Sequence, residues 1–437
     1  MNKKREFGPS EFEKEYFPCS KEWWCVEGFF TTIEDNKKWS FRASFSQATG
    51  RDGSIGSVYM ITLFDLERNK TYNYYSDDDF SKLKSSKDRF NIKFSKSFME
   101  GSYPNYKMKL FDTSHEIDMK LEYQAKSQPY WVAQEITNGW LPWGLGYYRY
   151  GFIPKNEIKG TINIKNKQLS IRGEGYFEHV WGDFSFFYLL PSERSIKKTI
   201  SIYFKLIGRW IRNQELKIPK SVMFSTDNRF SGYDWAWAIL DNNWSMFYGN
   251  IMSYIVEGPA TGVLILSKDG KKYKEFSNIS FKYPKIKQLS KHDLQYPIEL
   301  EITAKKDNEK LYLHIIPTFD TVEDLTEYSN KKNLLGFVVC QIPGKVNGYY
   351  ENGQKKLVFK GLSKLETHRL LSVFGHNSLK FNFGLSQNFF NIFVGLDSNY
   401  FRKKIDVDLR FLPHPNLKIN FKRIGKSKKT KYKKEVN

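Results

Sequence analysis

At residues 173–183 the chain reads Gly-Glu-Gly-Tyr-Phe-Glu-His-Val-Trp-Gly-Asp, directly after a predicted β-hairpin. In that hairpin Ile162 and Ile164 alternate with polar residues, a polar turn follows at 165–168, and alternation resumes with Leu169 and Ile171. If the chain stays extended, successive side chains point to opposite faces of the strand. One face then carries Phe177, His179, Trp181 and Asp183, and the other carries Tyr176, Glu178 and Val180.

His179 has two interpretations. An imidazole between aromatic rings, with a carboxylate close by, would suit acid–base chemistry in an apolar cavity. A buried histidine that is satisfied by a neighbouring backbone group is the more common case in protein cores. On the residues alone, the second interpretation is favoured at roughly two in three.

The composition indicates a soluble, globular, sheet-rich protein of two domains. The chain has 437 residues, of which 40% are hydrophobic and 27% are charged. Aromatic residues make up 17%, a share that favours pleated sheets and apolar cavities over helix bundles. Three cysteines, Cys19, Cys25 and Cys340, lack Cys-x-x-Cys spacing, which argues against a zinc site or a disulfide framework and favours a reducing cytoplasm.

The charge is strongly basic. A formal net charge of +21 attracts the phosphates of nucleic acid or of anionic lipid headgroups. No apolar run follows the basic N-terminus and no uncharged stretch reaches the length of a membrane span, so neither a signal peptide nor a transmembrane helix is predicted. The expected location is cytoplasmic, with peripheral attachment to the inner face of the membrane as an option. No nucleic-acid motif and no metal-ligand spacing occur, so we expect no nucleic acid, metal or other cofactor.

Two parts of the chain follow the same plan. A Trp-rich strand at 22–30, a turn at 35–38 and a return strand from Trp39 are repeated by a strand at 233–240, a turn at 241–243 and a return strand from Trp244. The second part also contains the hairpin turns Asp269-Gly270 and Asn352-Gly353. Gly361 and Glu366 follow the last hairpin as Gly173 and Glu178 follow the first. The pattern predicts an internal duplication of an all-β unit, folded as two tandem antiparallel barrels.

We divide the chain into five segments. They are an irregular N-terminal lead (1–20), a first barrel (21–195), a basic amphipathic insertion (196–230), a second barrel (231–372) and a C-terminal extension with a basic tail (373–437). A helix is predicted from Lys197 to Arg212, and its apolar side carries Ile200, Tyr203, Phe204, Ile207, Trp210 and Ile211. The helix either lies on an anionic membrane surface, together with the basic tail, or packs against a barrel; the two alternatives are about even.

The string Gly-x-Gly-Tyr-x-Glu-His-x-Trp-Gly resembles the signature of the hydroxyneurosporene synthase (carotenoid 1,2-hydratase) family, which is related to tocopherol cyclases. The strands with Glu22-Trp23-Trp24 and Trp235-Ala236-Trp237 are also similar to that family, over residues 20 to 370 or so. The resemblance implies two lipocalin-like barrels and a site for a long polyene or terpenoid chain. It further implies chemistry that protonates a carbon–carbon double bond without a metal or a nucleotide.

By the same resemblance, the family's catalytic His and the following Trp match His179 and Trp181. Its later Tyr-x-Asp pair falls on Tyr248-Gly249-Asn250, where Asn250 replaces the expected carboxylate. We predict catalytic roles for His179, Trp181, Tyr248 and Asp183, with Asp183 or Glu178 holding the charged form of the imidazole. We predict substrate contacts for Tyr176, Glu178, Trp235, Trp237 and Asn250. The rings of Trp181, Trp235 and Trp237 would stabilise a carbocation by ~2 kcal/mol each in a dry site.

The predicted function is therefore that of a hydratase- or cyclase-like enzyme that acts on a long isoprenoid or carotenoid-type substrate. The alternative is a non-catalytic, lipocalin-like carrier of an apolar lipid or isoprenoid. A nucleic-acid binder is the weakest interpretation, since the basic residues are dispersed or terminal. His368 is predicted to lie on the surface, as lone histidines usually do.

Overall fold

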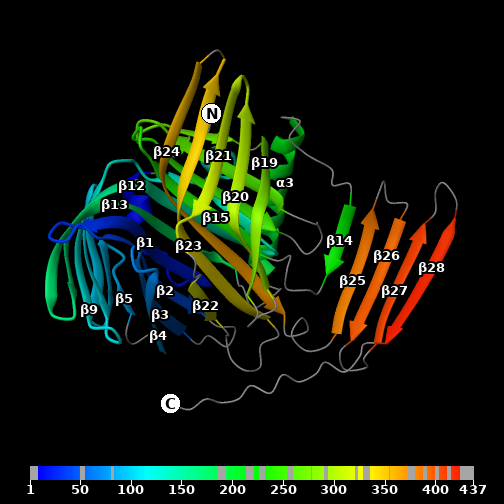
Figure 1. The fold of residues 1–437 in the computed structure, drawn as a ribbon, viewed down its shortest axis with the longest axis horizontal. Coiled ribbons are helices and arrows are strands. Elements are labelled where there is room, and N and C mark those ends of the chain that lie inside the picture. The colour runs from blue at the N-terminus through cyan, green and yellow to red at the C-terminus, as the bar shows by residue number, and fades with distance from the viewer. Residues whose placement is uncertain are drawn as a thin grey trace.

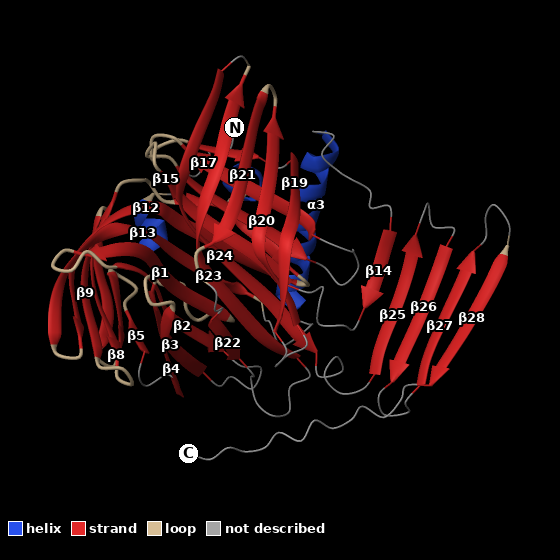
Figure 2. Ribbon diagram, viewed as in Figure 1, coloured by secondary structure: helices blue, strands red, loops and turns tan. Residues whose placement is uncertain are grey.

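A computed structural model describes residues 8–49, 55–79, 83–184, 193–212, 221–225, 232–252, 259–276, 278–289, 294–319, 323–327, 335–353, 355–372, 379–386, 391–398, 403–410 and 415–423. These residues form mostly antiparallel strands (Figure 1). Figure 2 shows how few helices accompany them. The helices are α1 (Pro9–Glu13), α2 (Gln134–Thr137) and α3 (Glu193–Arg212). None of the described helices is long and apolar enough to span a membrane.

The first large sheet has the strand order β4-β3-β2-β1-β13-β12-β9-β8-β7-β6-β5, with β10 and β11 paired to β12. Its strands are β1 (Lys21–Thr32), β2 (Lys38–Thr49), β3 (Ile55–Asp65), β4 (Lys70–Asp79), β5 (Leu83–Ser85), β6 (Phe90–Phe94), β7 (Ser97–Ser102), β8 (Asn105–Asp112), β9 (Ile117–Ala125), β10 (Tyr130–Trp131), β11 (Trp140–Trp143), β12 (Gly146–Ile164) and β13 (Lys167–Asp183).

The second large sheet repeats this plan in the order β18-β17-β16-β15-β24-β23-β21-β20-β19, with β22 paired to β23. Its strands are β15 (Gly232–Leu240), β16 (Ser245–Met252), β17 (Pro259–Ser267), β18 (Tyr273–Phe276), β19 (Asn278–Leu289), β20 (Leu294–Lys306), β21 (Glu309–Pro317), β22 (Glu323–Glu327), β23 (Leu335–Asn352) and β24 (Lys355–Ser372). In both sheets the first strand pairs with the last strand of a long hairpin, β1 with β13 and β15 with β24. The predicted all-β fold of two tandem lipocalin-like barrels is confirmed.

The long hairpins turn where the sequence predicts. Lys165 and Asn166 join β12 to β13 in the left-handed region, with φ of 51° and 63°, a conformation typical of two-residue hairpin turns. The polar turn is therefore two residues long. Asn352 ends β23, and Gly353, with φ of 59°, follows it at the corresponding place in the second barrel.

Residues of β13 alternate between two cores, as the period of two predicts. Phe177 and Trp181 belong to the core inside the first barrel. Tyr176 and Val180 belong to a core between the two sheets. Members of that second core from β15, β16 and β17 include Trp235, Trp237, Ile239, Phe247 and Ile265. Adjacent residues of β13 therefore face different compartments, which decides where the site can form.

A buried ionic network also joins the two barrels. Glu27 on β1 receives a hydrogen bond of 3.0 Å from the indole Nε1 of Trp237. Its carboxylate lies 3.3 Å from Nε of Arg42 and 3.3 Å from Nζ of Lys364, and all three ionic side chains are buried. Lys364 also donates to the carbonyl of Phe41 at 2.8 Å. One carboxylate of the first barrel thus neutralises a lysine of the second.

The N-terminal lead, predicted to be irregular, contains α1. Pro9 begins this short helix, where its fixed φ is compatible and its missing N–H is not needed. Phe12 is fully buried, and its ring packs edge-on against Phe177 with centroids 4.9 Å apart. The apolar contact inside the first barrel explains why this part of the chain is ordered.

The predicted helix in the insertion exists as α3, but a different side of it packs. Ile202 and Leu206 are buried against Ala133, with Trp140 and Tyr147 close by. Ile200, Tyr203 and Phe204, predicted on the apolar side, are exposed. The difference arises because Ser195 and Thr199 lie on the packed side, where the Thr199 hydroxyl donates to the carbonyl of Leu145 at 2.9 Å. Of the other residues predicted on that side, the side chains of Trp210 and Ile211 lie outside the described ones.

A third sheet was not predicted from the sequence. Its strands are β14 (Ser221–Ser225), β25 (Leu379–Ser386), β26 (Asn391–Ser398), β27 (Lys403–Arg410) and β28 (Asn416–Arg423), in that order. It combines a strand of the insertion with four strands of the C-terminal extension. The basic tail beyond Arg423 lies outside the described residues.

Candidate active site

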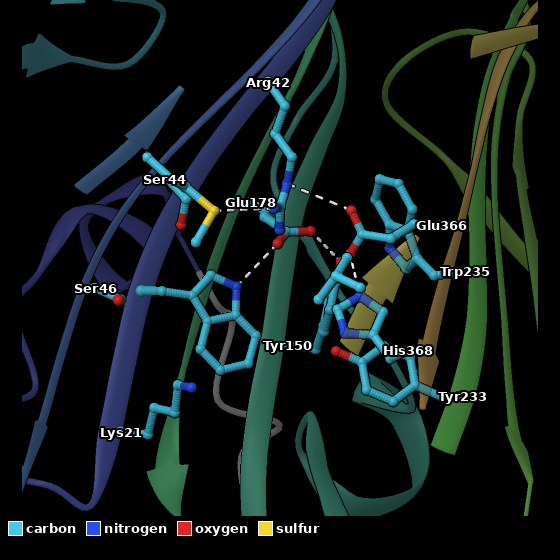
Figure 3. A pocket seen from close by; sticks show the side chains of 13 residues that line it. Lys21, Arg42, Ser44, Ser46, Tyr150, Glu178, Tyr233, Trp235, Glu366 and His368 are labelled. Atoms are coloured by element: carbon cyan, nitrogen blue, oxygen red, sulfur yellow. Dashed lines mark hydrogen bonds and ion pairs between the residues drawn. The ribbon is translucent and has the colours of Figure 1, made fainter. Parts of the chain in front are cut away.

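A pocket opens where the two large sheets face each other. From the first sheet it is lined by Lys21, Trp23, Arg42, Ser44, Ser46, Met60, Tyr150 and Glu178, and from the second by Tyr233, Trp235, Val339, Glu366 and His368. Its volume is about 50 Å³. Figure 3 shows the side chains of Glu178 and Glu366 near Arg42, with an ion pair between Arg42 and Glu366. The polar part of the pocket is formed by two buried glutamates, of which Glu366 pairs with Arg42 while Glu178 does not.

Glu178 is almost fully buried and has aromatic hydrogen-bond donors. The indole Nε1 of Trp23 donates to its Oε1 at 2.9 Å, and the hydroxyl of Tyr150 donates to its Oε2. The Tyr150 hydroxyl also lies 3.3 Å from that of Tyr176. Burial raises the pKa of Glu178 to about 8; the hydrogen bond from Tyr150 opposes that shift, and the negative charge of Glu366 adds to it. Glu178 is therefore a protonated carboxylic acid at neutral pH.

Glu366 has the opposite environment. Its Oε2 lies 3.4 Å from Nε of Arg42 and accepts a hydrogen bond from the amide of Gln341 at 2.5 Å. Its Oε1 contacts Nε2 of His368, whose ring stacks on Tyr233 with centroids 4.0 Å apart. Burial alone would raise the pKa of Glu366, but the positive charge of Arg42 and the contact with His368 outweigh it and lower that pKa. Burial lowers the pKa of His368, so a neutral imidazole donates to an ionised carboxylate.

The two glutamates occupy equivalent places in the repeat. Glu178 lies five residues after Gly173, which pairs with Phe30, and Glu366 lies five residues after Gly361, which pairs with Leu240. The duplicated strands thus bring one carboxyl group each to the same pocket. Different neighbours then make one an acid and the other a base, the pairing that general acid–base catalysis requires.

Some of the residues predicted to contact substrate meet at this interface. Glu178 and Trp235 line the pocket. Tyr176 lies behind it, with its ring 5.2 Å from that of Trp235 and 5.5 Å from that of Trp237. Trp237 does not line the pocket, since its indole bonds to Glu27.

His179 and Trp181 lie on the other side of β13, inside the first barrel. His179 is fully buried; its Nδ1 lies 2.6 Å from the carbonyl of Phe12 and its Nε2 2.9 Å from Oε1 of Glu22. Glu22, rather than the predicted Asp183 or Glu178, is therefore its carboxylate partner. Trp181 stacks on Tyr16 with centroids 4.0 Å apart. This arrangement matches the buried, satisfied histidine, and the catalytic role of His179 stays a prediction.

The remaining predicted residues lie elsewhere. Asp183 accepts a hydrogen bond of 2.8 Å from the hydroxyl of Tyr147 at the end of β13. Tyr248 and Asn250 lie in the second barrel, where the Asn250 amide donates to the Tyr248 hydroxyl at 2.8 Å and to Oδ2 of Asp234 at 3.4 Å. Neither pair lines the pocket. Of the three indoles predicted to stabilise one carbocation, Trp181 lies in the core of the first barrel, whereas Trp235 and Trp237 lie in the core between the sheets.

Sequence reasoning missed several pocket residues. His368, predicted on the surface, is 5% exposed and belongs to the pocket because β24 alternates it with Glu366 on the same face. Arg42 and Tyr150 do not belong to any recognisable sequence motif. The position of Glu366 in the repeat, equivalent to that of Glu178, is the sequence signal that points to it. Among the described residues, no cluster of His, Cys, Asp or Glu is arranged to hold a metal ion.

No protein-family model and no curated protein sequence matches the chain. The chain does match solved structures of similar fold. A protein of Nitrosomonas europaea designated AttH has a TM-score of 0.58 and 14% sequence identity, and the match covers 83% of this chain and 97% of that one. Kievitone hydratase from Nectria haematococca has a TM-score of 0.54 and 10% identity, covering 84% of this chain and 93% of that one. At these identities the similarity establishes a shared fold, that of two tandem lipocalin-like barrels.

Proposed function

We propose that the protein is an acid–base enzyme that adds water to, or cyclises, a carbon–carbon double bond of an apolar substrate. The observation that carries the proposal is the pocket itself, where protonated Glu178 faces ionised Glu366 and neutral His368. The resemblance to the carotenoid 1,2-hydratase family and the fold shared with kievitone hydratase support the same chemistry. The substrate that we propose is an isoprenoid or a carotenoid-type polyene.

The proposed reaction is balanced without an oxidant or a reductant. The carboxyl proton of Glu178 moves to one alkene carbon, the π electrons form the new C–H bond, and the neighbouring carbon becomes a carbocation. A water oxygen then attacks that carbon, and the Glu366–His368 pair accepts the proton that the water loses. Exchange with solvent returns a proton to Glu178. In a cyclisation a second double bond captures the cation, and the pair removes a proton from carbon.

The walls of the pocket suit a cationic intermediate. Trp23, Trp235 and Tyr233 line it, and the face of an aromatic ring stabilises a cation by ~2 kcal/mol in a dry site. A volume of about 50 Å³ is room for only a few water molecules. A long chain could place its reacting end there and extend outward, whereas a carrier would need to enclose far more of its ligand.

The test is direct. The protein is incubated with polyene and prenylated isoprenoids in heavy-oxygen water, and products are analysed by mass spectrometry. Incorporation of one labelled oxygen supports hydration, and an isomer of unchanged mass supports cyclisation. Recovery of unaltered ligand from a stable complex with every substrate would support the carrier alternative instead.

The pH dependence follows from Glu178. Its pKa of about 8 means that the acid form is lost as the pH rises through that value. We expect kcat/KM to fall on the alkaline side with an apparent pKa near 8. Because this pKa is raised above the ordinary value of 4.5, the stability that the proton contributes is complete below pH 4.5 and declines as the pH rises through 8. An alkaline limb retained in Glu178→Gln would contradict the assignment.

His179→Ala separates the two candidate acids. Since His179 joins α1 to Glu22 in the core, its loss leaves a buried carboxylate with one partner fewer. We expect the free energy of unfolding in urea to fall by about 3 kcal/mol, while kcat of the folded variant stays close to that of the wild type. Abolished turnover with unchanged stability would instead support the catalytic role predicted from the sequence.

A further inference from the structure

Helix α3 has an exposed apolar side. Its packed side buries Ile202 and Leu206 against the first barrel. On the other side Phe204 is 72% exposed, Ile200 45% and Tyr203 36%. Large apolar side chains grouped on one helix are rarely left in water without a partner.

The neighbouring loop adds to this apolar side. The hydroxyl of Tyr203 donates to the carbonyl of Gly144 at 3.0 Å, and Thr199 bonds to the carbonyl of Leu145. The side chain of Leu145 is itself 38% exposed. Leu145, Ile200, Tyr203 and Phe204 are called here the α3 apolar patch.

The charge around the patch indicates what covers it. Residues 193–212 contain six Lys or Arg and one Glu. Lys197, one helical turn before Ile200, and Lys205, next to Phe204, are both exposed. An apolar strip flanked by lysines, on a chain with a formal charge of +21, is complementary to a surface that is negative outside and apolar just beneath.

We propose that the α3 apolar patch docks on a membrane surface that contains anionic lipid, with Phe204 and Ile200 inserted among the acyl chains. This binding does not depend on the proposed catalytic chemistry. It would nevertheless help an enzyme whose substrate dissolves in lipid. Trp143, whose strand leads into the Gly144–Leu145 loop, packs edge-on against the pocket residue Tyr233 with centroids 5.5 Å apart. The strand that leads into the loop carrying Leu145 therefore contacts the pocket through Trp143.

The test is co-sedimentation of the full chain with vesicles of phosphatidylcholine, with or without phosphatidylserine. We expect binding only when phosphatidylserine is present, and weaker binding as salt is added. Removing the apolar ring in Phe204→Ser should weaken partitioning by about tenfold or more. Phe204 is exposed, so the melting temperature of the variant should not change.

Phe421→Ser is the matched control. Phe421 on β28 is 75% exposed, and both variants keep the basic tail, so the tail cannot account for a difference between them. We expect Phe421→Ser to bind like the wild type. Equal binding by Phe204→Ser and the wild type, or no binding to phosphatidylserine vesicles, would overturn the proposal. So would a wild-type dimer in size-exclusion chromatography that Phe204→Ser converts to monomer, because a second copy would then cover the patch.

Discussion

Glu178→Gln is expected to lower kcat by ~10²–10⁴-fold, the range that a positioned general acid contributes. Glutamine has nearly the same shape and can still accept the hydrogen bond from Trp23. It has no acidic proton to give to an alkene carbon. KM and the melting temperature should change little, since the carboxyl group is already neutral in the wild type at neutral pH. Turnover of the isoprenoid substrate under single-turnover conditions measures the effect.

Glu174→Gln is the control for this variant. Glu174 lies on the same strand, but its side chain is 45% exposed and its partner is Lys155 at 3.5 Å. The same chemical change there should leave kcat unaltered. If Glu178→Gln retained full activity, the proton donor would lie elsewhere and the pocket would lose its proposed role. If both the wild type and Glu178→Gln bound substrate without converting it, the protein would be a carrier.

Glu27→Ala is expected to lower the free energy of unfolding by ~3–5 kcal/mol, the loss typical when one partner of a buried ion pair is removed. Lys364, which is 1% exposed, would lose the carboxylate that neutralises it, and Trp237 would lose its acceptor. Since these contacts join the two barrels, a separate unfolding step for each barrel should appear in urea. Circular dichroism and tryptophan fluorescence report both steps.

Two further variants test whether the loss of stability comes from leaving a buried charge without its partner. Glu174→Ala removes a partly exposed pair and should change stability by about 0–1 kcal/mol. The double variant Glu27→Gln, Lys364→Met removes both buried charges and should recover part of the loss of Glu27→Ala. Unchanged stability in Glu27→Ala would mean that apolar packing alone holds the barrels together.

Local patterns were sufficient for the strands and hairpins. Alternation in β12 and β13, the turn residues Lys165-Asn166 and Asn352-Gly353, and the repeated Trp-rich strands each depend on neighbours in the chain. They predicted an all-β, duplicated fold, and the structure has it. Alternation also separated Glu178 from His179, because consecutive side chains of a strand cannot share a face.

Contacts distant in the sequence were not predictable in this way. Phe12 orders α1 only because a barrel core receives it, and α3 turns its Ile202 side inward because Thr199 meets the Gly144–Leu145 loop. Both depend on residues that come together after folding.

The candidate site shows most clearly which features depend on the local sequence and which depend on tertiary contacts. The sequence by itself determined that two barrels form and that Glu178 and Glu366 hold equivalent places in them. Only the tertiary structure decided that these carboxyl groups meet, that Arg42 and His368 join Glu366, and that His179 faces away from them. The physical reason is that a pKa depends on burial and on charges brought near in space, neither of which is local in the chain.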